Sequence, residues 1–260
     1  MKNLSEFIDN KKIKIVFCDI DDTLTHNGKL PAEPYSALWT LAQNNISVIP
    51  VTGRPAGWCE MIARFWPVHS VIGENGAFYF SYQQKKMKRF WCYDQKTRNE
   101  YHDKLKKIEA QILKEVPGSA TSSDQFCRLF DLAIDFKEDV EPLDTPSIQK
   151  IVDIFSDHGA QAKVSSIHVN GWFGNHNKLT TTKKFLMDEF QLNFDQAQEK
   201  ICFIGDSPND EPMFEAFIHS FAVSNIKDFS KQLIHPPSYV TPSPGGFGFV
   251  EFTQSLLKNL

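Results

Sequence analysis

Short apolar runs alternate with amphipathic stretches along the first third of the chain. Residues 13–18, 46–51 and 68–72 are rich in β-branched side chains, which predicts three buried strands. Residues 33–44 and 57–65 separate these strands and carry apolar residues at helical spacing. Strands that alternate with helices in this way predict a parallel, doubly wound sheet with right-handed crossovers.

The same alternation returns in the last third of the chain. A helix is expected from Asn177 or Lys178 to about Phe190, and residues 1–12 are expected to form a short amphipathic lead-in with Leu4, Phe7 and Ile8 on one face. Further strands are predicted at 200–204, 220–223 and 239–240, and further helices at 211–217, 226–233 and 248–257.

The middle of the chain follows a different pattern. Here we predict hairpins at 77–82 with 87–93 and at 162–164 with 167–173, helices at 97–116 and 147–158, and a strand at 126–136. Because this stretch is α+β, the expected fold class is an α/β core that is interrupted by an α+β insertion. The core is predicted at residues 1–83 and 175–260, and the insertion at residues 84–174.

Composition narrows the class of protein. The net charge of −4 and the pI of about 6.1 give no basic surface for nucleic acid, and no partner of that kind is expected. We expect no membrane span, because no apolar run reaches about 18 residues. The polar residues 1–12 lack a signal core, and five cysteines without a CxxC spacing favour a reducing cytoplasm. Nothing in the sequence indicates the oligomeric state.

Carboxylates gather directly after the first predicted strand, in Asp19-Ile20-Asp21-Asp22-Thr23-Leu24-Thr25. Like charges at close range repel, so such a cluster at the end of a central strand calls for a cation. Hard oxygen ligands with spare negative charge suit Mg²⁺. The alternative is a solvated acidic turn that follows an edge strand.

This stretch resembles the DxDxT motif of the haloacid dehalogenase-like (HAD) phosphohydrolases. Candidates for the other three motifs of that superfamily follow in order: Val51-Thr52-Gly53-Arg54, Lys178, and Gly205-Asp206-Ser207-Pro208-Asn209-Asp210. The chain is similar to subfamily IIB, the capped and Cof-like branch, which carries an α+β cap between the second and third motifs. Glu74-Asn75-Gly76-Ala77 resembles the segment that introduces this cap, where it is expected to shape the hinge.

The resemblance implies roles for the four catalytic candidates. Asp19 would be the nucleophile, and Asp21 would protonate the leaving oxygen and then activate water. The Thr52 hydroxyl would bind a phosphoryl oxygen, and Lys178 would neutralise negative charge shared by Asp19 and the phosphate. Lys183 and Lys184 are rivals for the lysine, although they fall inside the predicted helix.

The resemblance also implies a Mg²⁺ site and part of a substrate site. The carboxylates of Asp19 and Asp206, the backbone carbonyl of Asp21, and Asp210, directly or through water, would hold the ion. Gly53, Arg54 and Asn209 are expected at the substrate.

Within the insertion, Arg128 is a candidate anion contact. His168, Asn170 and Trp172 alternate along one predicted strand and therefore share a face. If this face looks toward the core, His168 and Asn170 would bind the leaving group; otherwise it is an exposed strand face with no ligand role.

The function that the resemblance implies is a Mg²⁺-dependent phosphatase for a small phosphorylated metabolite, with a sugar phosphate favoured and an aspartyl phosphate as intermediate. A phosphosugar mutase of the same superfamily is the alternative enzyme. A protein that accepts phosphate on an aspartate as a signal is the alternative of another class, and the large insertion and Asp21 count against it.

Overall fold

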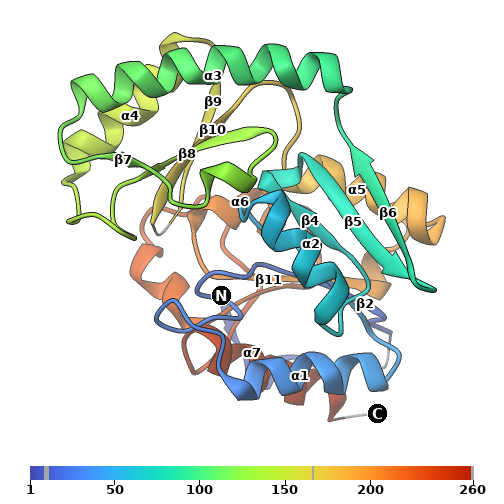
Figure 1. Ribbon diagram of the computed structural model, residues 1–260. Helices are drawn as coiled ribbons and strands as arrows, with labels where there is room; N and C mark the ends of the chain where they lie inside the picture. The colour runs from blue at the N-terminus through green and yellow to red at the C-terminus, as the bar shows by residue number, and fades with distance from the viewer. Residues whose placement is uncertain (9–11, 166, 259–260) are drawn as a thin grey trace.

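The computed structural model describes residues 1–8, 12–165 and 167–258 (Figure 1). Its centre is a six-stranded sheet in the order β1-β13-β12-β11-β2-β3, and every pairing in this sheet is parallel. The strands are β1 (Lys2–Asn3), β2 (Ile15–Cys18), β3 (Ser47–Pro50), β11 (Ile201–Gly205), β12 (Ser220–Ala222) and β13 (Tyr239–Val240).

Helices cover both faces of this sheet. Successive side chains of β2 point to opposite faces and are all apolar, so each face needs a layer of helices to bury it. Val16 and Cys18 pack into a cluster with residues of α1, α2 and α7, whereas Ile15 and Phe17 pack with residues of α5 and α6. The sheet is therefore doubly wound, as predicted. The helices are α1 (Ala32–Gln43), α2 (Ala56–Phe65), α5 (Lys178–Phe190), α6 (Glu211–Ala216) and α7 (Gly245–Leu257).

Strands β2 and β11 lie side by side where the strand order reverses. Cys18 of β2 pairs with Ile204 of β11, and the backbone N–H of Asp19 donates to Ile204 O at 3.0 Å. The chain continues from β2 to β3 on one side, and from β11 to β12 on the other. Ligands bind at such a switch point, beyond the carboxyl ends of the strands, so the loops after β2 and β11 occupy the expected location.

A second, antiparallel sheet extends from the edge of the core. It contains β4 (Val71–Gly73), β5 (Phe78–Gln83) and β6 (Lys86–Trp91). A single parallel bridge between Val51 and Ile72 links it to the end of β3. The predicted boundary between the core and the insertion falls inside this hairpin, since Gln83 is the last residue of β5 and residue 84 begins the turn to β6.

The insertion contains a four-stranded antiparallel sheet in the order β7-β8-β10-β9. Helices α3 and α4 cover the face that is turned away from the core (Figure 1). Ile108, Ile134, Phe155 and Val169 are among the apolar side chains buried between these layers. The elements are α3 (Gln95–Glu115), β7 (Ala120–Thr121), β8 (Asp131–Asp135), α4 (Thr145–Asp157), β9 (Gln161–Val164) and β10 (His168–Trp172).

The amphipathic lead-in predicted over residues 1–12, with Leu4, Phe7 and Ile8 on one face, is wrong where the structure describes it. Lys2 and Asn3 form an edge strand on β13, and only Leu4–Glu6 form a 3₁₀ turn. Phe7 is buried against Phe221 and Tyr239, whereas Ile8 is exposed, so the apolar residues do not share one face. Residues 9–11 lie outside the described residues.

The strand predicted over residues 126–136 is shorter than expected. Gln125–Cys127 form a 3₁₀ turn, and the strand begins only at Asp131. Arg128 forms ion pairs with Asp124, four residues before it, and with Asp131, three residues after it, so the chain turns here instead of continuing as a strand. Phe126, which the prediction placed in the strand, is exposed.

The helix predicted over residues 226–233 is also wrong, because only a 3₁₀ helix over Ser224–Phe229 forms there. Ile226 is its single buried residue, so no apolar face extends along the segment.

Three further 3₁₀ turns lie at Glu74–Gly76, Gln198–Lys200 and Pro208–Asp210. None of the described helices combines the length and the apolar character needed to cross a bilayer.

Candidate active site

The first predicted catalytic pair meets at the centre of the sheet. Asp19 follows β2, and Lys178 is the first residue of α5, after an Asn177 side chain that accepts a hydrogen bond from Thr180 N and caps the helix. Lys178 Nζ lies 2.7 Å from Asp19 Oδ1 and 2.8 Å from Asp210 Oδ1. Lys183 and Lys184 are exposed on the same helix. The lysine that reaches the nucleophile candidate is therefore Lys178.

Asp19, Asp206 and Asp210 form a buried group of carboxylates. One oxygen from each lies within 4.8 Å of the others. Burial raises the pKa of Asp19 to about 7, a change that Lys178 opposes and Asp210 strengthens. Burial also raises the pKa of Asp206 well above its usual range, with Asp19 and Asp210 adding to the effect. Burial thus disfavours the ionised form of both carboxyls unless a further positive charge lies beside them.

The loop after β11 is shaped to hold its two aspartates. Asp206 accepts a hydrogen bond from Thr23 Oγ1 at 3.2 Å, and its backbone N–H donates to Asp210 Oδ2 at 3.2 Å. A Cβ at Gly205 would lie 2.3 Å from the same Asp210 oxygen, so glycine is required there. This turn brings the Asp210 carboxylate to the backbone of Asp206 and to Lys178.

The three carboxylates fit a divalent cation. They supply hard oxygen ligands from two neighbouring strand ends, and when all three are ionised Lys178 is the one cation among the described residues that contacts two of them. Asp21, the fourth predicted ligand, does not join the group through its carboxylate, which Arg54 engages instead. The contribution predicted for Asp21 was its backbone carbonyl.

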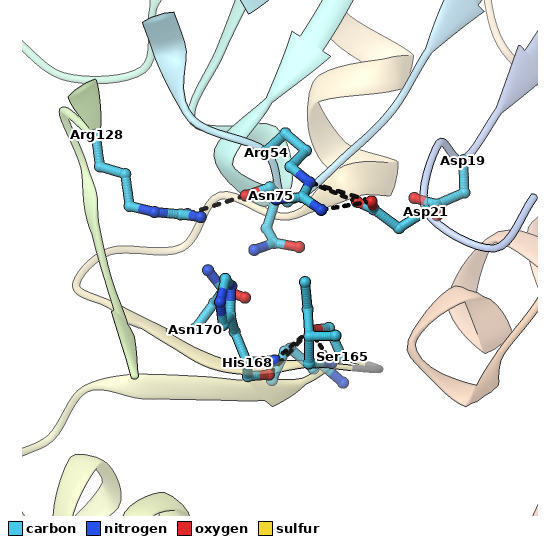
Figure 2. Close-up of a pocket in the computed structure, with 11 residues that line it drawn as sticks. Asp19, Asp21, Arg54, Asn75, Arg128, Ser165, His168 and Asn170 are labelled. Atoms are coloured by element: carbon cyan, nitrogen blue, oxygen red, sulfur yellow. Dashed lines mark hydrogen bonds and ion pairs between the residues drawn. The ribbon is translucent and has the colours of Figure 1, made fainter. Parts of the chain in front are cut away.

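Arg54 lies between Asp21 and the insertion (Figure 2). Its Nη2 lies 2.8 Å from Asp21 Oδ1, and its Nε lies 3.0 Å from Asp21 Oδ2. It also lies 3.4 Å from Glu138 of the insertion, and its Cζ is 4.5 Å from the centre of the Trp58 ring. Burial alone would lower the pKa of Arg54, but Asp21 and the other carboxylates raise it.

Thr52 and Gly53 form the turn that precedes Arg54. Thr52 is fully buried, and its Oγ1 accepts a hydrogen bond from Arg54 N at 3.0 Å, so its hydroxyl proton is free to donate elsewhere. Gly53 lines the same pocket as Asp19 and Asp21. The second predicted motif thus lies next to the first.

The insertion closes the other side of this pocket. His168 and Asn170 both line it, and Figure 2 shows them directed from β10 toward Arg54 and Asn75. Asn170 Nδ2 donates to Asp131 Oδ2 at 3.0 Å, and His168 Nε2 lies 2.9 Å from Glu138 Oε2. This contact with His168 is the main reason why the pKa of Glu138 is lowered. The strand face chosen from the sequence does look toward the core.

Arg128 also lines the pocket, but its guanidinium is engaged by the protein. Nε lies 2.9 Å from Asp124 Oδ1, Nη1 lies 3.1 Å from Asp131 Oδ1, and Nη1 also donates to the Gly53 carbonyl at 3.0 Å.

Asn209, which was expected at the substrate, does not line this pocket. It lies in an adjoining cavity that Lys178 also lines, and its Oδ1 accepts a hydrogen bond from Ser207 Oγ.

A buried carboxylate of the core holds the insertion in place. Glu74 is fully buried, and its side chain accepts hydrogen bonds from the backbone of Ala56 in the core and of Leu129 and Phe130 in the insertion. Together with the contact between Arg128 and Gly53, these bonds fix the insertion over the strand ends.

Sequence reasoning missed several residues that line the pocket. They are Asn75, Lys163, Ser165 and Ile167, and Glu138 contacts the pocket residues Arg54 and His168. Asn75 had a usable signal, because it lies in the Glu74–Ala77 segment that the family resemblance marked out. Ser165, Ile167 and Glu138 lie outside the regular strands, and Lys163 lies in β9, where no sequence pattern marked it.

The family model of haloacid dehalogenase-like hydrolases matches residues 16–125 and 175–243, more than half of the chain. No curated protein matches. Among solved structures, protein 0175 of Thermoplasma acidophilum is 17% identical with a TM-score of 0.73, and covers 94% of this chain and 98% of its own. A putative HAD/COF-like hydrolase of Plasmodium vivax is 16% identical with a TM-score of 0.72, covering 98% and 99%.

The sucrose-phosphatase of Synechocystis, solved with sucrose and phosphate, also shares the fold, at 15% identity and a TM-score of 0.62, covering 94% of this chain and 98% of its own. The chain belongs to the haloacid dehalogenase-like hydrolase family, as the four motifs predicted. It is therefore an enzyme with a hydrolase fold, and its α+β insertion lies between the second and third motifs, as in subfamily IIB.

Proposed function

We propose that this protein is a Mg²⁺-dependent phosphatase that hydrolyses a small phosphorylated metabolite, with Asp19 as the nucleophile. The observation that carries the proposal is the position of Lys178 Nζ, 2.7 Å from Asp19 and 2.8 Å from Asp210 in one buried group. A lysine that joins a nucleophilic carboxylate to a metal-binding one reduces the repulsion that Asp19 would exert on an incoming phosphate.

The reaction would proceed in two displacements. An Asp19 oxygen attacks phosphorus, the bond from phosphorus to the leaving oxygen breaks, and that oxygen takes a proton from Asp21. A water molecule then gives a proton to Asp21 and attacks the phosphorus of the aspartyl phosphate, and the bond to Asp19 breaks. Inorganic phosphate and a restored Asp19 result.

The other core residues would hold the phosphoryl group. The Thr52 hydroxyl can donate to one of its oxygens, and Gly53 allows close approach of the backbone. Mg²⁺ would be held by Asp19, Asp206 and Asp210 with the Asp21 carbonyl, and when bound it offsets the charge of the phosphate.

Residues 1–83 and 175–260 would supply the chemistry, and residues 84–174 would act as a cap over the leaving group. Hydrogen bonds from Leu129 and Phe130 to Glu74, and from Arg128 to Gly53, support this division, because they fasten the insertion at the entrance of the pocket. A closed cap excludes water from the reaction.

A sugar phosphate is the favoured substrate. Asn75, Ser165 and Asn170 line the part of the pocket that faces the insertion, and such side chains can bind hydroxyl groups. The fold shared with the sucrose-phosphatase of Synechocystis agrees with this choice. The phosphosugar mutase is less favoured because both arginines of the pocket, Arg54 and Arg128, are engaged with carboxylates. A mutase needs a second anion site.

We propose the cytoplasm as the compartment. Cys18, Cys59, Cys92 and Cys127 are free thiols in the structure. A reducing compartment preserves thiols in this state.

The test is a panel of phosphomonoesters that includes hexose 1- and 6-phosphates, followed by phosphorus NMR with Mg²⁺ and with EDTA. We expect inorganic phosphate to accumulate with Mg²⁺ alone and without a bisphosphate activator. Activator-dependent isomerisation with little phosphate release would establish the mutase instead. Full activity in EDTA, or no turnover of any ester, would contradict the proposal.

A further inference from the structure

Asn75 holds an unusual position beside the pocket. Its backbone is in the left-handed region, with φ 55° and ψ 28°, where asparagine is tolerated better than most residues. Two hydrogen bonds hold this turn against the second motif: Asn75 N donates to Thr52 O at 3.0 Å, and Glu74 N donates to Arg54 O at 3.1 Å. The backbone at residue 75 is therefore fixed relative to Thr52 and Gly53.

The side chain of Asn75 has an unsatisfied donor. Its Nδ2 is buried and has no hydrogen-bond partner among the residues that the structure describes. A buried amide without a partner costs free energy, which a ligand can recover by accepting the hydrogen bond. A Cβ at Gly53 would lie 3.3 Å from this Nδ2, so glycine at position 53 leaves room for the amide.

The amide faces the end of the pocket where the leaving group would lie. Asn75 lines the same pocket as Asp19 and Asp21 of the core and His168 and Asn170 of the insertion. Figure 2 shows its carboxamide between Arg54 and those two insertion residues. In an in-line displacement at phosphorus, the leaving group departs on the side opposite the nucleophile. That side faces the insertion.

We propose that Asn75 is a specificity-determining residue whose Nδ2 donates a hydrogen bond to an oxygen of the leaving group. The inference rests on the proposed phosphatase function and extends it. The preferred substrate is an ester whose leaving group carries a hydroxyl or another oxygen acceptor near the bridging oxygen. A flat hydrocarbon leaving group would leave the amide unpaired.

Asn75→Gly tests this assignment with little backbone strain, because glycine adopts a positive φ readily. The probes are glucose 1-phosphate, glucose 6-phosphate and glycerol 3-phosphate, and the fastest of these is compared with p-nitrophenyl phosphate. The matched control is Asn45→Gly, at an exposed asparagine with φ 58° that lies outside the pocket.

We expect Asn75→Gly to lower kcat/KM about tenfold for the hydroxylated ester. For p-nitrophenyl phosphate, and for the inhibition constant of inorganic phosphate, we expect a change of less than about threefold. The ring of the first probe carries no hydroxyl near the bridging oxygen, its nitro group being at the far end, and the second probe has no organic leaving group. Asn45→Gly should match the wild type throughout. Equal losses on both esters, or no loss on the hydroxylated ester, would overturn the assignment. A wild type that turns over neither ester would refute the phosphatase proposal itself.

Discussion

Arg54 holds the carboxylate of Asp21 through two of its nitrogens, with Nη2 2.8 Å from Oδ1 and Nε 3.0 Å from Oδ2. This forked geometry fixes the direction of the carboxylate as well as its position. Arg54 also contacts Glu138 of the insertion. A residue of the insertion therefore helps to orient Asp21, the proposed general acid and base, through Arg54. The sequence had suggested Arg54 only as a substrate contact.

Arg54→Lys should therefore lower kcat by about tenfold or more, since a lysine keeps the charge but cannot form the fork. The Mg²⁺ concentration that gives half of the maximal activity should stay unchanged, because Arg54 does not touch the three-carboxylate group. Arg64→Lys is the control: Arg64 is an exposed residue of α2 that pairs with Glu60. Steady-state kinetics with a Mg²⁺ titration measure both quantities, and a wild-type kcat in Arg54→Lys would remove the orienting role.

Lys178→Met should lower kcat by about 10²–10³-fold, the cost of losing one preorganised electrostatic contact. It should also destabilise the fold by about 3 kcal/mol in EDTA, because Asp19 and Asp210 would be left buried without their cation. Mg²⁺ should recover part of that stability. Urea unfolding with and without Mg²⁺ measures this effect, with Lys184→Met on the exposed face of α5 as the control. Unchanged stability in EDTA would show that the carboxylates do not depend on Lys178.

His176 should make an unfavourable contribution to stability in mild acid, which the raised pKa of Asp19 opposes. Both ring nitrogens are buried without a hydrogen-bond partner among the described residues, and burial lowers the pKa of His176 from 6.5 to about 4. As the pH falls, His176 is protonated in the unfolded chain at a higher pH than in the folded protein. The contribution of His176 to stability is therefore fully present above about pH 6.5 and is lost as the pH falls from about 6.5 to about 4. By pH 5 the loss is about 2 kcal/mol.

His176→Phe should remove this loss while a ring remains stacked on Trp172, where the centroids are now 5.6 Å apart. The measurement is urea unfolding at pH 7.5 and pH 5 for the wild type, for His176→Phe, and for His102→Phe on the exposed face of α3. The same change of stability between the two pH values in all three proteins would show that His176 does not contribute to the acid sensitivity.

His168→Ala should change KM, or the ranking of substrates, more than the response to Mg²⁺. His168 lies in the insertion and contacts Glu138, and neither residue belongs to the three-carboxylate group. His158→Ala, at an exposed histidine of the same insertion, is the control. The check is kcat/KM across the ester panel together with the Mg²⁺ titration; wild-type kinetics on every ester would exclude His168 from the substrate site.

The core of the fold could be predicted because its strands and helices differ in apolar period, and because the motif residues follow strand ends. Val16 and Phe17 show why: the apolar run that contains them predicted a buried strand, and the two side chains pack on opposite faces of the sheet. The edge strand at Lys2 could not be foreseen, since it depends on pairing with Tyr239 far along the chain. The contacts of Arg128 could not be foreseen either. The sequence suggested that Arg128 binds an anion of the substrate, but which anion it contacts depends on how the loop folds, and in the structure Asp124 and Asp131 occupy its guanidinium.

The measurement that tests the central claim most directly is mass spectrometry of the enzyme, quenched in acid during turnover. We predict a phosphoryl group on the peptide that contains Asp19, formed only with Mg²⁺ and substrate and absent from Asp19→Asn, which should fold normally and lose nearly all turnover. A wild type that releases phosphate while its label lies on another residue, or an Asp19→Asn protein that keeps substantial turnover, would contradict the account.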